Sequence, residues 1–342
     1  MTDRAKAAVP GHLDRLRRAR LDPERRPASM RDAFGAALVE LGRSEPRVVV
    51  LDGDLANSTR TDAFADAFPQ RFFEMGIAEQ NMIGVAAGMA TAGLIPFAVT
   101  FAAFASARDL DQVRLVVAQT RLHVVVVGAY AGLLASRLGK SHVSLEDVAL
   151  MRALPGMRVV APADAIETRV ELRRAAAAEG PVYIRLARGE VPTLFASADE
   201  CDGMPVLLRD GSDVALVTTG AQAHRTLEAA GLLARHGIDA LVLHVPTIKP
   251  LDADAIVAVA GRTGAVVTAE DHSVVGGLGS AVAEVLGERL PTPLVRVGTH
   301  DVAVESGRDE DLIERYGLSA AHVASAAREL LDRLGRQGRG VR

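Results

Sequence analysis

Short runs of apolar and β-branched residues alternate with stretches of helical periodicity along almost the whole chain. Apolar strands separated by helices predict a parallel sheet that helices cover on both faces. In the first half the strands are predicted at residues 47–51, 72–74, 96–101, 123–127, 158–161 and 182–186. The helices of that half are predicted at 78–92, 109–119, 144–153 and 165–178.

A second series of the same kind follows and predicts a second domain. Its strands are predicted at 213–218, 240–245, 265–269 and 294–297, and its helices at 221–236, 252–260, 277–290 and 320–334. Between the two series, proline, serine, aspartate and glycine replace the periodic pattern, which indicates an interdomain linker. We therefore predict an α/β protein with two doubly wound domains at 28–190 and 212–338, joined by a linker at 191–211. Residues 1–27 are predicted to be a charged tail without strands.

Composition excludes several classes of protein. The net charge is -4, and the arginines between Arg15 and Arg26 form a local stretch typical of a solvated helical tail, so we expect no nucleic-acid partner. Cys201 is the only cysteine, which excludes an internal disulfide and predicts a reducing, cytoplasmic location. The first residues are charged and do not resemble a signal peptide.

One long uncharged segment, 82–107, needs a separate interpretation because its length would suffice to cross a bilayer. Gly93 and Pro96 interrupt it, and an aromatic run follows. The segment is therefore predicted to form a buried helix, a turn and a buried strand, and no membrane partner is expected.

Candidate chemistry lies in the loops after the strands, where parallel sheets bind their ligands. The first loop runs from Asp52 to Ser58 and crowds two carboxylates, an amide and a hydroxyl into one turn. Turn formation and helix capping explain these residues when they are taken alone. No GxGxxG or P-loop pattern follows, so an ordinary nucleotide fold is not indicated.

Glu79 lies in the first turn of the helix predicted at 78–92. Most glutamates in that position only complement the helix dipole. The rest of this helix is apolar, and Gly84, Ala87 and Gly88 allow close backbone approach, so we predict that it is buried all round. A partly desolvated carboxyl group at the start of this helix either binds a polar ligand or carries a proton.

Two further loops hold candidate residues. Phe101 and Phe104, at the end of a predicted strand, could belong to the core or could form a stacking platform for a flat ligand. His142 precedes the pattern Ser144-x-x-Asp147, which predicts a helix cap at Ser144. A single loop histidine is more often incidental than catalytic.

Taken in this order, the features resemble the pyrimidine-binding half of the transketolase family. The resemblance is carried by the residues at 76–82 (GIAEQNM), 100–101, 111–114, 141–142, 146–147, 152–156 and 162–164. Residues 270–272 (EDH) and 276–279 (GGLG) resemble the family's C-terminal domain, so the resemblance extends from about residue 31 to residue 334. It implies a thiamine-diphosphate pyrimidine-binding domain with a parallel sheet, followed by a transketolase C-terminal domain.

A full-length transketolase also has a diphosphate-binding domain, in which a Gly-Asp-Gly motif and an asparagine hold magnesium. The resemblance has no counterpart for that domain here, because Asp52-Gly53-Asp54 lies in the wrong domain. It therefore implies a beta subunit whose thiamine diphosphate is completed by a separate alpha subunit. That partner would supply the Mg²⁺ ligands, so none is expected in this chain, and an α2β2 assembly is expected.

The resemblance also implies a role for individual residues. Glu79 would hydrogen-bond a ring nitrogen of the cofactor's aminopyrimidine and so activate it. Phe101 and Phe104 would sandwich that ring, and Leu55, with Asp54 beside it, would hold the cofactor bent. His142 would contact the donor's oxygens at the reacting carbon. The sugar-phosphate contacts would be Arg31, Ser58, Tyr130 and Arg188.

Three positions depart from the family pattern. Ala107 stands where many members have a third aromatic residue, Tyr130 where they have a phosphate-contacting histidine, and Leu138 where an aspartate reads a donor hydroxyl. The reaction implied is transfer of a two-carbon ketol unit from a ketose, expected to be a phosphate, to an aldose. The departures predict an unusual donor or acceptor.

Three alternatives remain open at this point. The beta subunit of a 2-oxoacid dehydrogenase has the same architecture, and a deoxyxylulose-phosphate-synthase-like enzyme shares much of the pattern. A chain that kept the fold but serves only as a scaffold is the third. Glu79, Phe101, Phe104 and His142 together argue against the scaffold.

Overall fold

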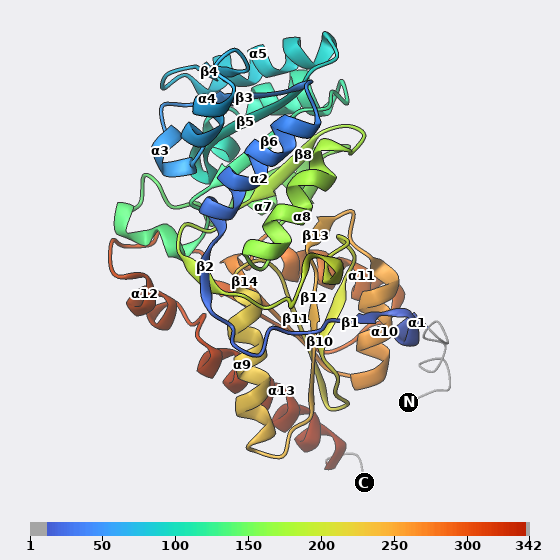
Figure 1. Cartoon of the computed structure of the whole chain (residues 1–342). Coiled ribbons are helices and arrows are strands. Elements are labelled where there is room, and N and C mark those ends of the chain that lie inside the picture. The colour runs from blue at the N-terminus through green and yellow to red at the C-terminus, as the bar shows by residue number, and fades with distance from the viewer. Residues whose placement is uncertain (1–11, 340–342) are drawn as a thin grey trace.

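The computed structural model describes residues 12–339, which form two α/β units, the first at the top of Figure 1 and the second below it. The sheet of the first unit has the strand order β13-β7-β8-β6-β5-β3-β4. Six of these strands were predicted, and they run parallel to one another. They are β3 (Val48–Asp52), β4 (Phe72–Glu74), β5 (Ile95–Phe101), β6 (Val125–Ala129), β7 (Arg158–Val160) and β8 (Val182–Arg185).

Helices cover both faces of this sheet, as the pattern predicted. Helices α2 (Met30–Ser44) and α8 (Ala165–Ala176) pack on one face, against a core that includes Val48 and Val50 of β3. Helices α5 (Glu79–Thr91) and α7 (Asp147–Ala153) pack on the other, with Val49 and Leu51. Successive residues of β3 therefore enter opposite cores, which is why the strand is a continuous apolar run. Helix α2 was not among the predicted helices.

The second sheet has the order β1-β10-β12-β11-β14-β15 and is parallel except between β10 and β12. Its strands are β1 (Arg17–Arg18), β10 (Val206–Arg209), β11 (Val214–Thr218), β12 (Ala240–His244), β14 (Val266–Ser273) and β15 (Leu294–Thr299). Residues of α9 (Gln222–Ala234) and α13 (Ala320–Arg339) enter the core on one face. Residues of α10 (Ala253–Thr263) and α11 (Leu278–Arg289) enter the core on the other.

The prediction of a strandless charged tail at residues 1–27 is wrong for residues 12–27, and residues 1–11 lie outside the described residues. Strand β1 pairs with β10 at the edge of the second sheet, and β2 (Pro27–Ser29) pairs with β9 (Glu190–Pro192). Only α1 (His12–Arg15) is helical there. Strands of two or three residues are too short to show an alternating pattern, and charged residues are typical of edge strands.

The segment predicted as a linker is an ordered part of the fold. Leu194 and Phe195 are fully buried, and their N–H groups donate to Asp164 Oδ2 over 2.7 and 3.0 Å. Strand β10 lies inside this segment, while β13 (Thr247–Lys249) returns to the first sheet and pairs antiparallel with β7. The two units are therefore tied together by shared strands, and the predicted domain bounds stay predictions.

Two predicted helices differ from those observed. The one at 109–119 is broken into η2 (Phe104–Arg108), α6 (Leu110–Gln112) and η3 (Val113–Ala118), of which η2 and η3 are π-helical. The one predicted at 144–153 begins only at Asp147. The cap predicted at Ser144 is not formed, since the buried hydroxyl of Ser144 has no hydrogen-bond partner. The remaining short elements are α3 (Ala56–Thr59), α4 (Asp62–Ala67), η4 (Leu133–Leu138), η5 (Ala198–Glu200) and α12 (Asp309–Arg315).

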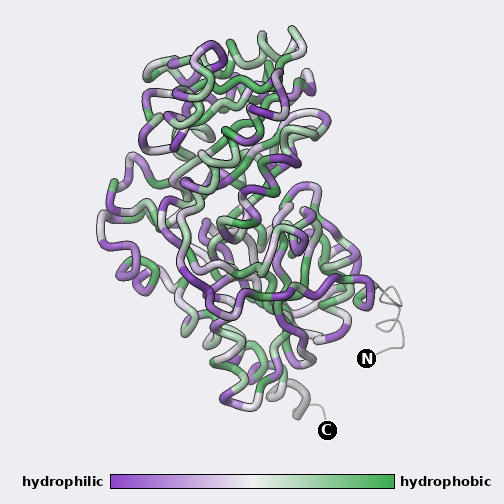
Figure 2. Tube along the Cα trace, viewed as in Figure 1, coloured by the Kyte–Doolittle hydropathy of each residue, from purple (hydrophilic) through white to green (hydrophobic). Residues whose placement is uncertain are grey.

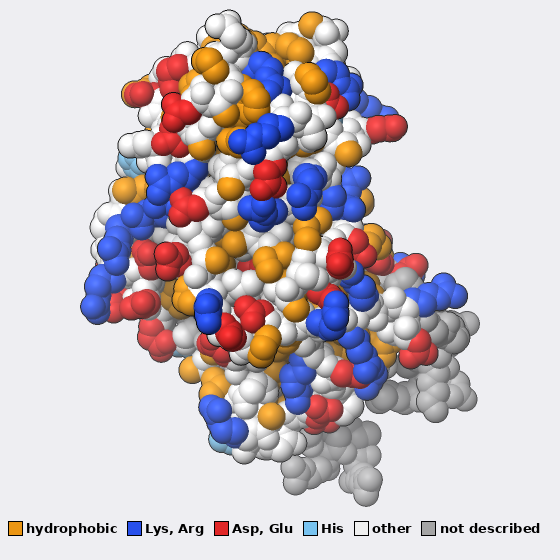
Figure 3. All heavy atoms as spheres, in the orientation of Figure 1, with side chains coloured by type: hydrophobic (Ala, Val, Ile, Leu, Met, Phe, Trp, Pro, Cys, Tyr) orange, Lys and Arg blue, Asp and Glu red, His pale blue; other side chains and the backbone are white. Residues whose placement is uncertain are grey.

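Hydropathy follows this architecture. The central strands of both units are hydrophobic and the hydrophilic residues lie on outer helices and loops (Figure 2). On the face drawn in Figure 3, acidic and basic side chains are interspersed and are not gathered into one patch of a single sign. Among the described helices, none combines the length and the apolar character that crossing a membrane requires.

Candidate functional site

The carboxyl ends of five neighbouring strands bring the candidate residues together. Strands β8, β6, β5, β3 and β4 are adjacent in the first sheet, and the loops after them leave the same edge. This is the edge at which open parallel sheets bind ligands. The predicted residues that lie in or next to these loops are Asp54, Leu55, Ser58, Glu79, Phe101, Phe104, Tyr130, His142 and Arg188.

Two carboxylates hold the loops of this edge in place. The buried Asp52 accepts from Leu55 N over 2.6 Å and from the hydroxyls of Thr59 and Thr61 over 3.0 and 2.7 Å, and burial raises the pKa of Asp52. Glu74 Oε1 accepts from Asp54 N over 2.9 Å and also from the backbone of the next loop. Asp54 itself has a φ of 65°, so the turn that presents Leu55 is strained and held by these bonds.

Glu79 begins α5, and its side chain is 2% exposed, so its predicted burial is confirmed. The helix is not buried all round, however, because Asn81, Gly84 and Gly88 lie on an exposed face. The only hydrogen bond that the Glu79 carboxylate accepts from the described residues comes from Arg108 Nη1, over 2.8 Å. A buried carboxylate thus depends on one side-chain donor, which is an unusual arrangement for a purely structural group.

Arg108 connects Glu79 with the aromatic residues. Its guanidinium carbon lies 4.2 Å from the centroid of the Phe104 ring, and its backbone carbonyl accepts from Gln80 Nε2 over 3.0 Å. The next residue, Asp109, is fully buried, and neither of its carboxylate oxygens has a hydrogen-bond partner. Burial, with a further contribution from the charge of Glu79, raises the pKa of Asp109 to about 8. Sequence reasoning named neither Arg108 nor Asp109 as a candidate.

The two phenylalanines contact each other and leave no slot between them. Their centroids are 5.9 Å apart at an interplanar angle of 31°, whereas a ring between them would need roughly twice the ~3.5 Å contact distance. The other neighbour of Phe101 is Tyr130, which stacks on it at 4.2 Å and 24°. The predicted sandwich is therefore not the arrangement observed, and a flat ligand would stack on the face of Phe104 that Arg108 covers.

His142 lies at this aromatic cluster in edge-to-face contacts, with its ring centroid 5.3 Å from that of Phe104 and 6.0 Å from that of Phe101. Its Nδ1 is 2.8 Å from the hydroxyl of Ser141. The histidine is only partly exposed, whereas Leu138 in the same loop is exposed. The fold therefore places His142 against Phe101 and Phe104, and its predicted contact with the donor sugar stays a prediction.

Arg31, Tyr130, Arg188 and Ser58 form a basic cluster beside the aromatic residues. Arg31 Nη1 donates to Tyr130 Oη over 2.8 Å and to the carbonyl of Ser58 over 3.3 Å. The guanidinium carbons of Arg31 and Arg188 lie 5.9 and 5.5 Å from the centroid of the Tyr130 ring. Within residues 12–339, neither arginine forms an ion pair with a carboxylate, and the Nε atom of each is buried without a partner. Two fork-shaped donors of this kind suit a tetrahedral anion.

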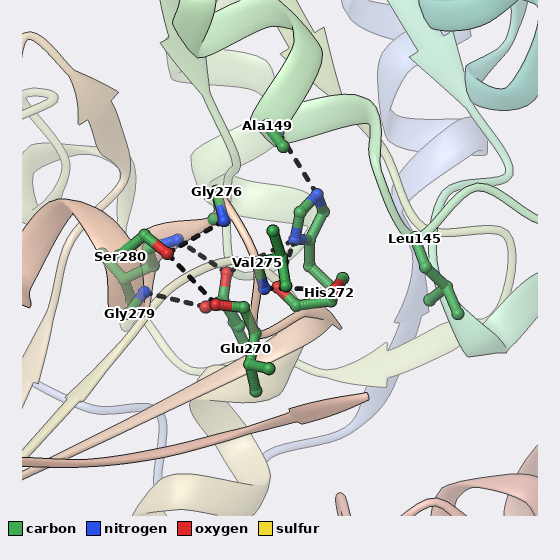
Figure 4. A network of polar contacts seen from close by, with 12 residues as sticks. Leu145, Ala149, Glu270, His272, Val275, Gly276, Gly279 and Ser280 are labelled. Atoms are coloured by element: carbon green, nitrogen blue, oxygen red, sulfur yellow. Dashed lines mark hydrogen bonds and ion pairs between the residues drawn. The ribbon is translucent and has the colours of Figure 1, made fainter. Parts of the chain in front are cut away.

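A second buried glutamate lies where the units meet (Figure 4). Glu270 accepts from the N–H groups of Leu278 and Gly279 over 2.6 and 2.8 Å, and burial raises its pKa. Close by, His272 Nδ1 donates to the carbonyl of Ser273 over 2.7 Å, and its Nε2 accepts from Ala149 N over 3.4 Å. Fixed backbone groups satisfy this network, which joins α11 to α7.

The described residues contain no group of three or more His, Cys, Asp or Glu side chains that could hold a metal ion. A magnesium site built from this chain alone is therefore not found in the described part. The prediction that a partner supplies the magnesium ligands stays a prediction.

Residues 26–193 match the family described as transketolase, pyrimidine binding domain, and residues 203–323 match transketolase, C-terminal domain. The 6-deoxy-6-sulfo-D-fructose transketolase subunit SqwH of Clostridium sp. (strain MSTE9) is 45% identical, over 89% of this chain and 95% of the relative. An apulose-4-phosphate transketolase subunit of Phocaeicola vulgatus is 35% identical, over 89% of this chain and 97% of the relative.

Solved structures agree with these relatives. A structure described as a split gene transketolase, inactive beta4 tetramer, superposes with a TM-score of 0.83 and is 49% identical, covering 89% of this chain and 98% of that chain. The transketolase of Leishmania mexicana superposes with a TM-score of 0.77 at 21% identity, and the match covers 95% of this chain and 48% of that one. The second likeness shows the fold alone.

Proposed function

The chain belongs to the transketolase family, and from this premise we propose that it is the beta subunit of a split, thiamine-diphosphate-dependent transketolase. In this proposal it transfers a two-carbon ketol unit from a ketose to an aldose. A separate alpha subunit supplies the diphosphate site and the Mg²⁺ ligands, so the chain has no activity alone. An α2β2 assembly and a cytoplasmic location belong to the same proposal.

One observation carries the catalytic part of the proposal. Glu79 is buried at the carboxyl edge of the sheet, and among the described residues its only hydrogen-bond donor is the half-exposed side chain of Arg108, which a ligand could replace. The face of Phe104 beside it can stack a flat ring, and Arg108, a flat donor, makes both contacts in the structure. A cofactor aminopyrimidine needs the same pair of contacts, so these residues fit that group.

The roles of the chain's own residues follow from these positions. When bound, thiamine diphosphate supplies the carbon nucleophile for attack on a ketose carbonyl. Glu79 holds a proton at its carboxyl oxygen toward the ring, and Phe104 orients the ring by stacking. Leu55 would contact the cofactor from the turn that Asp52 and Glu74 fix. His142, which lies edge-on to Phe104, would contact the oxygens of the donor sugar.

The basic cluster defines the substrate class. Arg31 and Arg188 would hold a terminal phosphate or sulfonate, with Ser58 and Tyr130 completing the contact. The names of two relatives support this class, since one refers to a 6-sulfo ketose and the other to a 4-phosphate sugar. Leu138, in the loop of His142, and Ala107, next to Arg108, depart from the family pattern and are exposed, and we propose that they change the preference among donors.

The exposed face of α5 supports the two-subunit architecture. Ile77, Gly84 and Gly88 lie on or next to that face, and Ile77 is one of the most exposed large apolar residues described. A Cβ added at Gly84 or Gly88 would meet no atom within 4 Å, so the helix offers a flat surface to a partner. We propose that the alpha subunit packs here, next to Glu79.

The experiment is reconstitution with a separately produced chain that carries a transketolase diphosphate-binding half. The mixture, with thiamine diphosphate and Mg²⁺, is assayed for ketol transfer against a panel of phosphorylated, sulfonated and unmodified ketoses. We expect turnover by the mixture, none by either chain alone, and a preference for donors with a terminal anion. Release of carbon dioxide from pyruvate without ketol transfer would assign the chain to the 2-oxoacid dehydrogenase class instead.

A further inference from the structure

Arg108 is held at both ends by the first turn of α5. Its backbone carbonyl accepts from the Gln80 side chain, and its guanidinium donates to the carboxylate of Glu79. In between, the side chain crosses the ring face of Phe104, at 4.2 Å from the centroid. Arg108 ends the π-helical turn η2, whose wider winding brings it over Phe104 at the start of the same turn.

These contacts use the two surfaces on which the proposed cofactor site depends. A guanidinium is planar, delocalised and a hydrogen-bond donor, so it can stack on an aromatic ring and bond a carboxylate at once. An aminopyrimidine would stack on the same ring and bond the same carboxylate. Only one flat group can lie against that face of Phe104, so the two occupants exclude each other.

We propose that Arg108 occupies the cofactor's ring position in the unassembled chain and must swing away from Glu79 and Phe104 when the ring enters. This inference rests on the proposed function, since it concerns the same site. Arg108 is then a gate that lowers the affinity of the chain for the cofactor until assembly and diphosphate binding outweigh the lost contacts.

The surroundings allow this movement. The Arg108 side chain is 46% exposed, and its other end is fixed through the backbone, so a rotation of the side chain is sufficient. The departure of the guanidinium leaves Glu79 without an ion-pair partner in the described part of the chain, close to the buried and unbonded Asp109. Sharing a proton with a ring nitrogen relieves that cost, so the ring can take the place of Arg108.

The test is the affinity of the reconstituted complex for thiamine diphosphate, measured by isothermal titration calorimetry in saturating Mg²⁺. Arg108→Ala removes the competing group, and we expect the Kd for the cofactor to fall about tenfold, or about 1.4 kcal/mol. Arg108→Lys keeps the charge but loses the planar fork, so an intermediate fall is expected. The matched control is Arg114→Ala, because Arg114 is also 46% exposed but pairs with the exposed Asp111 instead of a buried carboxylate. It should bind as the unaltered complex does.

Each outcome decides between the two proposals. Unchanged or weaker cofactor binding by Arg108→Ala, with normal binding by the unaltered complex, overturns the gate and leaves the proposed function standing. Absence of binding by the unaltered complex removes the proposed function and the gate together.

A crystal structure of the loaded complex provides a test without any variant. We expect the Gln80 bond to the Arg108 carbonyl to persist and the Glu79 bond to be broken. Arg108 still bonded to Glu79 beside the bound ring would contradict the gate.

Discussion

Glu79 and Glu270 are both buried glutamates beside the first turn of a helix, yet their partners differ in kind. Glu270 accepts from two backbone N–H groups at the start of α11, which cannot leave without unwinding the helix. Within residues 12–339, Glu79 accepts only from Arg108, a half-exposed side chain that can rotate away. Burial of the carboxylate therefore does not distinguish these two residues, whereas the kind of partner does.

The same contrast holds for the sheet edges that carry the two residues. The carboxyl edge of the second sheet is closed by the first unit, since Ser273 N donates to Leu145 O and Arg185 donates to the carbonyl of Asp271. The carboxyl edge of the first sheet instead presents the aromatic and basic clusters. Two similar α/β units thus use the same edge differently, one for domain packing and one for the candidate site.

Replacement of Glu79 has the largest expected effect on activity. We expect Glu79→Gln to lower ketol transfer by the reconstituted complex by about 10²–10⁴-fold, because it removes the proton carrier. The thermal midpoint of the chain should stay within about 2 °C, since the amide can still accept from Arg108. Retained turnover would contradict a catalytic role for Glu79.

Two matched glycines test the partner surface. Gly88 of α5 and Gly287 of α11 are both exposed, and neither has an atom within 4 Å of an added Cβ. We expect Gly88→Leu to weaken association with the alpha subunit more than tenfold, measured by analytical ultracentrifugation, because it fills a flat docking surface. Gly287→Leu should assemble normally, and both chains should fold. Equal assembly by both variants would place the interface elsewhere.

Truncation of the second glutamate should damage stability instead of catalysis. Glu270→Ala leaves the N–H groups of Leu278 and Gly279 buried without an acceptor, and each such group costs about 1–3 kcal/mol. We expect the thermal midpoint to fall by roughly 5–10 °C in scanning calorimetry. The control is Glu284→Ala on α11, because the exposed carboxylate of Glu284 pairs with the side chain of Arg152 and with no buried backbone group among the described residues. A small shift for Glu270→Ala would mean that water replaces the carboxylate.

Replacement of Asp109 has the smallest expected effect, a change in thermal stability that depends on pH. Its pKa is raised to about 8 in the folded chain, so between about pH 4 and pH 8 the folded state binds more protons than the unfolded state. Its contribution to stability is therefore present at low pH and is lost as pH rises through that window. We expect Asp109→Asn to match the unaltered chain near pH 4 and to melt on the order of 5 °C higher at pH 9. Asp111→Asn, at an exposed position, should leave the pH profile unchanged.

Much of this molecule was visible in the sequence. The central parallel strands of both sheets and most of the long helices follow the apolar periodicity, because each of them buries one or two faces against the same layers along its whole length. Helix α2 and the strands β1, β10 and β13 were not predicted. The loops with Glu79, Phe101, Phe104 and His142 could be placed at one sheet edge, since parallel strands share a direction. The burial of Glu79 was predicted correctly.

Tertiary structure alone decided what these residues contact. Arg108 bonds Glu79 although the two are 29 positions apart in the sequence, and β1, near the N-terminus, pairs with β10. The closed contact between Phe101 and Phe104, and the exposed face of α5, likewise depend on how separate elements meet. Periodicity along a chain records burial against a layer, but it does not record which side chain from a distant segment fills the remaining space, because that is set only when the segments pack together.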